Sequence, residues 1–329
     1  MQIFHIEEND ANQRLDKFIK KLLPNAPLGG IYKMLRTGKV KIEGKKRENT
    51  YKLQVGEEVK IWLSDEEITT LQRMQDEEII PKWNIGTLQK EDILYEDDAL
   101  LILNKSPGIN VHPWDHKTDE ISLIDQGRDY FWKKYNSLTF RPSLVHRIDR
   151  DTSGVIIIAK TKRSLDSMLS QLQSGGFKKI YHTIVLGRPS HQSWTIKKPL
   201  LRIEDAHNEA KVRVDKAWLE AITHYSILEI YPHIWDKSAS LLECQIETGR
   251  THQIRVHMKS IDCPVLWDEA YGDKKINSFL KRECLLKRQM LHAYSVSFLH
   301  PETKKNLTIQ APYKDDMSGV IQYFRKERV

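Results

Sequence analysis

The chain has 329 residues, of which 40% are hydrophobic and 29% charged, a composition that supports a sizeable core and excludes a disordered or collagen-like protein. Lys and Arg outnumber Asp and Glu by 52 to 45, a net charge of +7 that favours acidic partners, with nucleic acid first among them. At about 150 residues per domain, this length predicts two unequal domains.

The chain carries no pattern typical of export or membrane insertion. Its first residues, MQIFHIEENDANQR, include acids and lack an apolar signal-peptide core, and nowhere do about 18 apolar residues run together. Cys244, Cys263 and Cys284 form no CxxC pair, which fits neither a disulfide framework nor a zinc cage. We therefore expect a cytoplasmic protein that contacts no membrane.

Residues 1–63 are predicted to form a small basic domain of helices and strands, with 13 basic and 8 acidic side chains. Helical spacing is seen in Leu15, Phe18, Ile19 and Leu22, and again in Ile31, Met34 and Leu35. Strand-like alternation follows in Val40, Ile42, Val55, Val59 and Ile61. Residues 64–92 hold only 3 basic but 8 acidic side chains, so we predict an acidic linker over 64–90 with no function of its own.

From residue 91 to residue 329 the patterns are mixed, and strands outnumber helices. The segment 93–105 predicts a hairpin, 155–160 a buried strand and 164–176 a helix that ends at two glycines. Further strands are predicted at 179–187, 211–218, 223–232, 240–248 and 292–301. These patterns indicate an α+β body with a mixed sheet.

The segment LVHRIDRDTSGVIIIAK places five charged or ionisable side chains directly before an apolar strand. An apolar run of this kind is typical of a strand covered on both faces, so the charges lie at the entrance to a buried element. A carboxylate there needs a partner or a function. For Asp151 we favour a structural role in a turn that ends at Gly154.

A second segment, IETGRTHQIRVHM, alternates apolar with polar residues and predicts a strand. Gln253, Arg255 and His257 would then share its polar face. His252 and His257 would lie on opposite faces, so we expect no metal site. The chain also lacks a dinucleotide-binding or P-loop motif, and Ser153 lacks the G-x-S-x-G context of a hydrolase nucleophile.

These segments resemble a known family. HRIDRDTSG (146–154) resembles the HRLDxxTSG signature of the RluA family of pseudouridine synthases, and GRTHQIRVH (249–257) resembles its third motif. Residues 14–62 are similar to an S4 RNA-binding domain, an arrangement typical of the RluC and RluD branch. Further matches, at 93–105, 179–187, 264–272 and 291–301, extend the resemblance over nearly the whole chain.

The resemblance implies a largely antiparallel sheet and an RNA pseudouridine synthase that needs no cofactor or metal. It implies that Asp149 is the nucleophile, that Arg147 takes the space vacated by a flipped base, that Tyr181 stacks on the base or transfers a proton, and that Arg255 pairs with the carboxylate. An adjacent guanidinium would keep a buried Asp149 ionised. We expect further RNA contacts at Arg250 and His252, and phosphate contacts at Lys33, Arg36, Lys39, Lys45 and Lys46.

The implied substrate is large-subunit ribosomal RNA, free or in an assembly intermediate. The chain departs from the family pattern at Ser106-Pro107 and at Ile148, and both changes are conservative for packing. It also carries Trp267 where many members carry Gly, so the target uridine stays open. So does the choice among attack at C1′, attack at C6 and a glycal route. The alternatives are a transfer-RNA synthase, a non-catalytic ribosome-assembly protein, and a hydrolase centred on Ser153 or Asp151.

Overall fold

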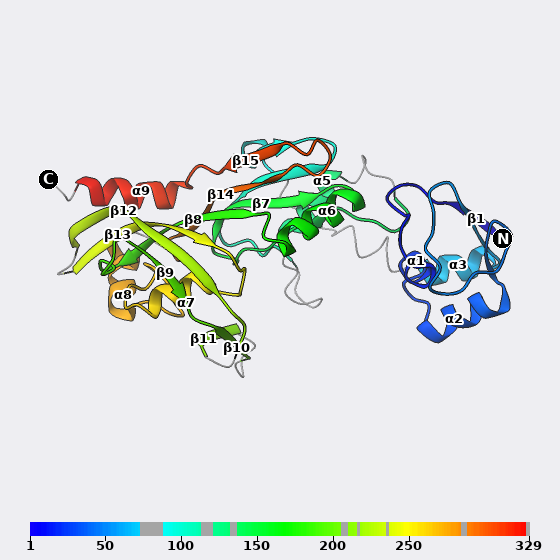
Figure 1. The fold of residues 1–329 in the computed structure, drawn as a ribbon, viewed down its shortest axis with the longest axis horizontal. Coiled ribbons are helices and arrows are strands. Elements are labelled where there is room, and N and C mark those ends of the chain that lie inside the picture. Colours follow the sequence, from blue (N-terminus) through cyan, green and yellow to red (C-terminus); the bar gives the residue numbers. More distant parts are fainter. Residues whose placement is uncertain are drawn as a thin grey trace.

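The computed structural model describes residues 1–72, 88–112, 121–131, 137–204, 210–215, 218–234, 237–283 and 288–326 (Figure 1). Residues 1–72, here the N-terminal unit, have their own hydrophobic core and lie at one end of the molecule. Residues 88–326 form the main body. No helix in the described part of the chain is long and apolar enough to cross a membrane.

The N-terminal unit packs three helices against a small antiparallel sheet of order β1-β3-β2. Its elements are β1 (Gln2–His5), α1 (Leu15–Leu22), α2 (Leu28–Thr37), β2 (Val40–Ile42), β3 (Glu58–Ile61) and α3 (Asp65–Gln72). The apolar residues predicted to define two helices are buried in its core. The residues predicted to alternate as strands are buried there too, except Val55, which lies in an exposed turn before β3.

Helix α3 occupies the start of the segment that we predicted as a linker. Ser64 and Glu67 form a reciprocal cap, in which the Glu67 N–H donates to the Ser64 hydroxyl and the Ser64 N–H donates to the Glu67 carboxylate. Ile68 is fully buried against the core of the N-terminal unit. The linker prediction therefore differs from the structure over 64–72, and residues 73–87 of that segment lie outside the described residues.

The main body is built on one large sheet of order β4-β5-β7-β14-β8-β13-β12-β9, with β6 paired to β7 and β15 to β14. All pairs are antiparallel except β7 with β14, so the predicted α+β fold with a mixed, largely antiparallel sheet is confirmed. The strands are β4 (Ile93–Glu96), β5 (Leu100–Lys105), β6 (Ser143–Leu144), β7 (Ser153–Ala159), β8 (Lys178–Leu186), β9 (Ser193–Lys197), β10 (Leu200–Glu204), β11 (Ala210–Val214), β12 (Ile222–Ile234), β13 (Lys237–Ile246), β14 (Leu291–Leu299) and β15 (Asn306–Gln310).

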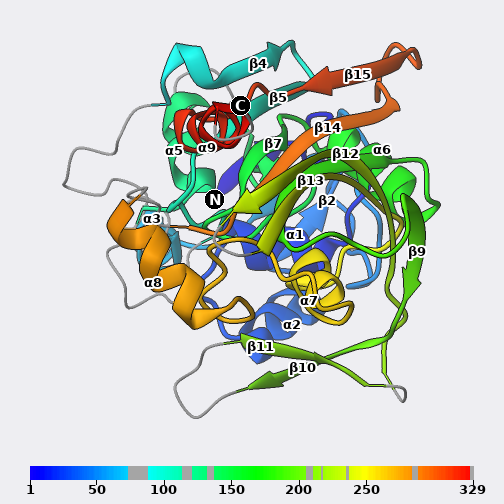
Figure 2. The ribbon, with the colours of Figure 1, turned by 90° about the vertical axis from the view of Figure 1, so that its left-hand side faces the viewer.

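Helices flank this sheet, and β10 and β11 form a separate hairpin that projects from it (Figure 2). The helices are the 3-10 turn η1 (Lys90–Asp92), α5 (Leu123–Phe131), α6 (Lys162–Gln173), α7 (Gln253–Lys259), α8 (Lys274–Glu283) and α9 (Asp315–Lys326). The predicted hairpin, buried strand and helix correspond to β4–β5, β7 and α6. The Thr161 hydroxyl caps α6 by accepting from the Ser164 N–H.

Gly154 allows the parallel pair to form at the centre of the sheet. Its φ is +111°, and an added Cβ would collide with the backbone of Ala293 on β14. Only glycine permits this close approach. The result is that the loop 145–152, which precedes β7, ends at the middle of the sheet.

The two parts of the molecule are fastened together by a polar contact. The Asp10 carboxylate accepts hydrogen bonds from the backbone N–H groups of Leu138 and Thr139 and from the hydroxyls of Ser137 and Thr139. Gln13 also donates to the Thr139 hydroxyl, at 2.7 Å. Leu138 packs against the core of the N-terminal unit. Residues 137–139 are therefore part of the main body in the sequence, but their side chains contact the N-terminal unit.

Candidate active site

Asp149 lies in the loop that joins β6 to β7, and a buried lysine holds this loop in place. Lys105 is 1% exposed, and its ammonium group donates to the carbonyl oxygens of Ser106, Ile109 and Arg150 at 2.7–3.0 Å. The Gly108 N–H donates to the same Arg150 carbonyl at 3.0 Å. The loop 105–109 therefore fixes the backbone immediately after Asp149.

The segment after the TGR sequence is helix α7, so the prediction of a strand there is wrong. The side chain of Gln253 fixes the turn before it: its Oε1 accepts from the Arg250 N–H and the Thr248 hydroxyl, and its Nε2 donates to the Ile222 carbonyl. Polar and apolar residues of α7 are buried alike. Because the polar side chains also face inward, the sequence shows alternation instead of the period of a surface helix.

Arg255, on α7, joins two carboxylates. Its Nη1 donates to Asp149 Oδ2 at 3.1 Å, and its Nε and Nη2 donate to the two oxygens of Asp268 at 2.7 and 2.9 Å. Burial alone would lower the pKa of Arg255, but hydrogen bonds and negative charge from Asp268 and Asp149 raise it above its usual value. The predicted pairing of Arg255 with Asp149 is therefore present, and it is held by a third residue, Asp268, which is fully buried.

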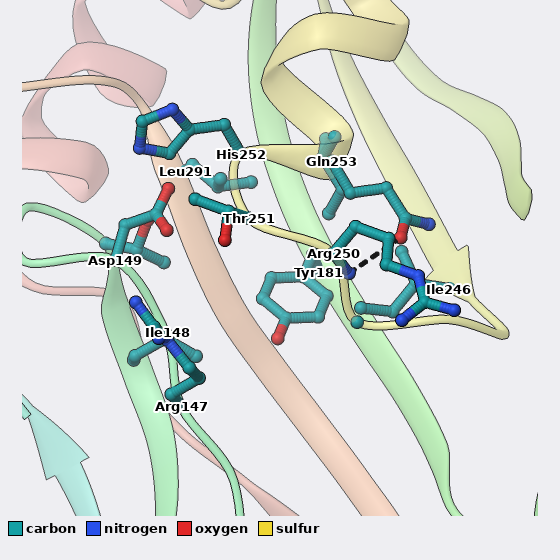
Figure 3. Close-up of a pocket in the computed structure, with 13 residues that line it drawn as sticks. Arg147, Ile148, Asp149, Tyr181, Ile246, Arg250, Thr251, His252, Gln253 and Leu291 are labelled. Carbon is teal, nitrogen blue, oxygen red and sulfur yellow. Dashed lines mark hydrogen bonds between the residues drawn. The ribbon is translucent and has the colours of Figure 1, made fainter. Parts of the chain in front are cut away.

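Tyr181 on β8 forms the floor of a pocket next to Asp149 (Figure 3). Burial and the charge of Asp149 raise the pKa of its hydroxyl above the usual value, so the phenol stays protonated at neutral pH. The Asp149 side chain keeps 23% exposure. The cavity measures about 60 Å³, and its walls come mainly from two segments, 147–152 and 249–254, with Tyr181, Ile246 and Leu291.

Three further residues with predicted RNA contacts line this pocket. Arg147 and Arg250 are exposed, and the Tyr181 ring lies between them in Figure 3. The Arg250 Nε donates to the Glu220 carbonyl at 3.2 Å. His252 precedes α7 with a φ of +53°, and a hydrogen bond of 2.9 Å joins its Nδ1 to the Tyr271 hydroxyl. Burial lowers the pKa of His252, so its ring is neutral at pH 7.

The other predicted RNA contacts lie on the N-terminal unit and not at the pocket. Lys33 and Arg36 extend from α2, Lys39 follows it, and Lys45 and Lys46 lie after β2; all five are exposed. A groove of about 500 Å³ includes two of them; it is lined by Tyr32, Leu35, Arg36, Lys46, Arg47, Glu48 and Asn49.

Several other expectations can be compared with the structure. Ser153 is fully buried and bonded to His292 Nδ1 at 2.8 Å, so it cannot serve as a hydrolase nucleophile for an external substrate. Trp267 has a φ of +60°, a conformation that glycine adopts easily, and its ring packs in a core cluster away from the pocket. Cys244 and Cys263 are buried free thiols, whereas Cys284 lies outside the described residues. Among the described residues no group of three His, Cys, Asp or Glu side chains is arranged to hold a metal ion.

The pocket also shows what the sequence reasoning missed. Residues 264–272, which match the family, have the pattern P-x-x-x-D-x-x-YG, in which Asp268 is the acid. Nothing in that run reveals that its carboxylate is buried against Arg255. Tyr271, from the same run, bonds to His252 and lies under the Arg255 guanidinium, 5.2 Å from the ring centroid. The run therefore supplies the residues that support the pocket from behind.

Comparison with known proteins agrees with this geometry. Residues 99–260 match the family model described as RNA pseudouridylate synthase. The chain is 36% identical to "Ribosomal large subunit pseudouridine synthase C" of Buchnera aphidicola subsp. Baizongia pistaciae over 94% of this chain and 92% of that protein. It is 32% identical to the protein of the same name from Vibrio vulnificus, over 100% and 98% of the two chains.

A solved structure shares the fold of most of this chain. "Human RNA Pseudouridylate Synthase Domain Containing 4" superposes with a TM-score of 0.57 at 22% identity, covering 71% of this chain and 93% of that one. Identity this low shows the fold alone. The near full-length similarity to the bacterial enzymes shows the family, and the chain belongs to the RNA pseudouridylate synthases, isomerases that act on RNA.

Proposed function

We propose that this enzyme converts uridines of large-subunit ribosomal RNA to pseudouridine, with Asp149 as the nucleophile. The observation that carries the proposal is the Asp149 carboxylate, held by Arg255 at 3.1 Å and open to a pocket whose floor is Tyr181. The ribosomal substrate is supported by the relatives that are at least 30% identical over nearly the whole chain and bear that name. The reaction on such RNA would take place in the cytoplasm.

The geometry suits an isomerisation within one nucleotide. The N1–C1′ bond breaks, the base turns and a C5–C1′ bond forms, so the only net transfer is of a proton from C5 to N1. A target inside a stem must first be extruded, at a cost of a few kcal/mol that RNA contacts elsewhere offset. Arg147, exposed beside the pocket, would fill the space that the base leaves.

Arg255 supplies the electrostatic condition for catalysis. A buried carboxylate tends to take up a proton, and an adjacent guanidinium opposes this tendency. The bidentate pair with Asp268 prevents Arg255 from turning away from Asp149. Asp149 then stays oriented toward the nucleotide in the pocket.

Tyr181 would contribute both its ring and its hydroxyl. The ring provides a stacking face for the base, and the hydroxyl lies close enough to Asp149 to have its pKa raised by that charge. A protonated phenol at this place can relay the proton that leaves C5. Tyr181→Phe should therefore lower kcat at least about tenfold with RNA affinity unchanged, and an unchanged kcat would restrict Tyr181 to stacking.

The N-terminal unit would bind RNA as an S4-like domain. Its exposed cations on α2 and after β2 can contact phosphates, which position an RNA without reading its sequence. The domains we propose are thus this unit, extended by α3 from residue 63 to residue 72, and a catalytic domain over 91–329.

The decisive experiment is site-resolved mapping of pseudouridine in ribosomal and transfer RNA from cells with and without the protein, complemented by the parent or Asp149→Asn. We expect discrete large-subunit sites to lose the modification and only the parent to restore it. Purified Asp149→Asn should be slower by about a thousandfold or more while it binds RNA normally. Loss of pseudouridine at transfer-RNA sites would show that the substrate is transfer RNA. No change at any site would favour a role in ribosome assembly without catalysis.

A further inference from the structure

A largely buried lysine lies behind Gly249, a residue of the pocket wall, and no described carboxylate forms an ion pair with it. Lys179 precedes Tyr181 by two residues on β8, so both side chains project from the same face of the strand. Lys179 is only 9% exposed. Its Nζ lies 3.7 Å from the point that a Cβ on Gly249 would occupy, and both Gly249 and Ile246, its partner across the strands, line the pocket.

The charge of Lys179 is not compensated within the described part of the chain. Burial lowers the pKa of its amine, and no carboxylate acts to raise it. The other deeply buried lysines differ in this respect: Lys105 donates to three carbonyl oxygens, and Lys160 pairs with Glu96 at 2.6 Å. Burying an ammonium group without a partner is costly, so Lys179 requires another explanation.

The surroundings of Lys179 are neutral or positive. His146 is close enough for the Lys179 charge to act on it, and burial followed by that charge lowers its pKa to about 3, so the imidazole is neutral. Arg147 and Arg250 stand at the rim of the same pocket. The one carboxylate that faces the cavity, Asp149, is already paired with Arg255.

We propose that Lys179 binds a phosphate of the RNA backbone next to the nucleotide that enters the pocket. The inference rests on the proposed function, because extruding a nucleotide brings its backbone toward the enzyme. A phosphate of the RNA would supply the negative charge that no described carboxylate supplies to Lys179 in the free protein. A cation that is largely shielded from water but still 9% exposed can be reached by that anion and attracts it more strongly than a fully exposed lysine does. Lys179 is thus a substrate-positioning residue, separate from the residues that act on the base and the sugar C1′.

The test compares Lys179→Met with Lys178→Met, a matched control on the same strand whose exposed side chain points to the other face. The substrate is large-subunit RNA isolated from cells that lack the protein. We expect Lys179→Met to raise KM about tenfold or more and to leave kcat within about threefold. The dependence of log Kd on log salt should become shallower by about 0.7–0.9, the contribution of one phosphate. Lys179→Arg should restore most of the affinity, and Lys178→Met should change none of these quantities.

Other results would overturn the assignment. A loss of kcat with unchanged KM and salt dependence would show that Lys179 acts on the chemical step, and unchanged kinetics would show that it contacts no phosphate. A second measurement uses the unaltered protein: acetylation of Lys179 by acetic anhydride, read by mass spectrometry, should slow at least about fivefold when RNA is bound. Equal acetylation with and without bound RNA would contradict the proposal even if Lys179→Met failed to fold. Absence of pseudouridine formation by the parent enzyme would instead refute the proposed function.

Discussion

The pocket of the main body and the groove of the N-terminal unit use charge in opposite ways. In the pocket, the buried Arg255 donates hydrogen bonds both to the buried Asp268 and to Asp149, whose side chain is 23% exposed. In the groove, Arg36, Lys46 and Arg47 are exposed, and the structure shows no carboxylate paired with them in the described residues. Buried charges depend on each other, so removing one affects the whole network, whereas exposed charges contribute small and separate amounts. The first arrangement suits chemistry and the second suits binding of a polyanion.

The strongest test of this contrast is Asp268→Asn. Removing one partner of a buried ion pair typically costs about 3–5 kcal/mol, so we expect a clear loss of thermal stability. Because Arg255 would no longer be held toward Asp149, kcat should also fall by about a hundredfold while RNA affinity stays the same. Unfolding curves and single-turnover rates measure the two effects. The adjacent, exposed Glu269→Gln is the control; equal effects from both substitutions would contradict the network.

Acid should weaken the main body before the N-terminal unit. His292 is fully buried, and burial lowers its pKa to about 4, below the value of about 6.5 in an unfolded chain. Between these two values the unfolded state binds a proton that the folded state does not. The free energy of unfolding should therefore fall as pH drops from 6.5 to 4, by at most about 1.4 kcal/mol per pH unit for this histidine.

Urea unfolding followed by tryptophan fluorescence can measure this slope, because seven of the eight tryptophans lie outside residues 1–72. His292→Asn should make the slope shallower. The N-terminal unit contains a single histidine, the exposed His5, so its own unfolding should vary little over the same pH range. An identical slope in parent and variant would show that His292 does not contribute.

A smaller effect is expected at the contact between the two regions. Asp10→Ala removes the acceptor of four hydrogen bonds and should weaken docking of the N-terminal unit by about 1.5–3 kcal/mol, the range for bonds to a charged group. Small-angle scattering should then show a larger radius of gyration. The exposed Glu8→Ala is the control, and unchanged scattering of Asp10→Ala would mean that other contacts suffice.

The smallest effects should come from the groove itself. Replacing Arg36 and Arg47 together by Gln should weaken RNA binding about three- to tenfold and make its salt dependence shallower, with kcat at saturating RNA unchanged. Glu48→Gln, in the same groove, should act in the opposite direction because it removes a negative charge. A change in kcat from either variant would show that the groove and the pocket are not separate in function.

Much of the site could be predicted from the sequence because its residues lie in contiguous motifs. Asp149 and Arg255 were placed by HRIDRDTSG and GRTHQIRVH, and the structure brings them within 3.1 Å. The helical conformation of the second motif could not be predicted, because the polar side chains of α7 have hydrogen-bond partners inside the protein. Polar and apolar residues therefore alternate along α7, the pattern that is typical of a strand. Helix α3 could have been found, since Ser64 and Glu67 have the spacing of a capping box. Neither the burial of Asp268 nor the uncompensated charge of Lys179 has a local signal, because both depend on what the fold packs around them.

The contact at Asp10 also determines how far the enzyme can be treated as modular. Deleting residues 1–63 would uncover the apolar side chain of Leu138 and leave the Thr139 N–H without its acceptor. It would also leave α3 without the core that buries Ile68. A transplant of the N-terminal unit onto another synthase must therefore carry α3 and a matching 137–139 loop, so that unit and loop are exchanged as one piece.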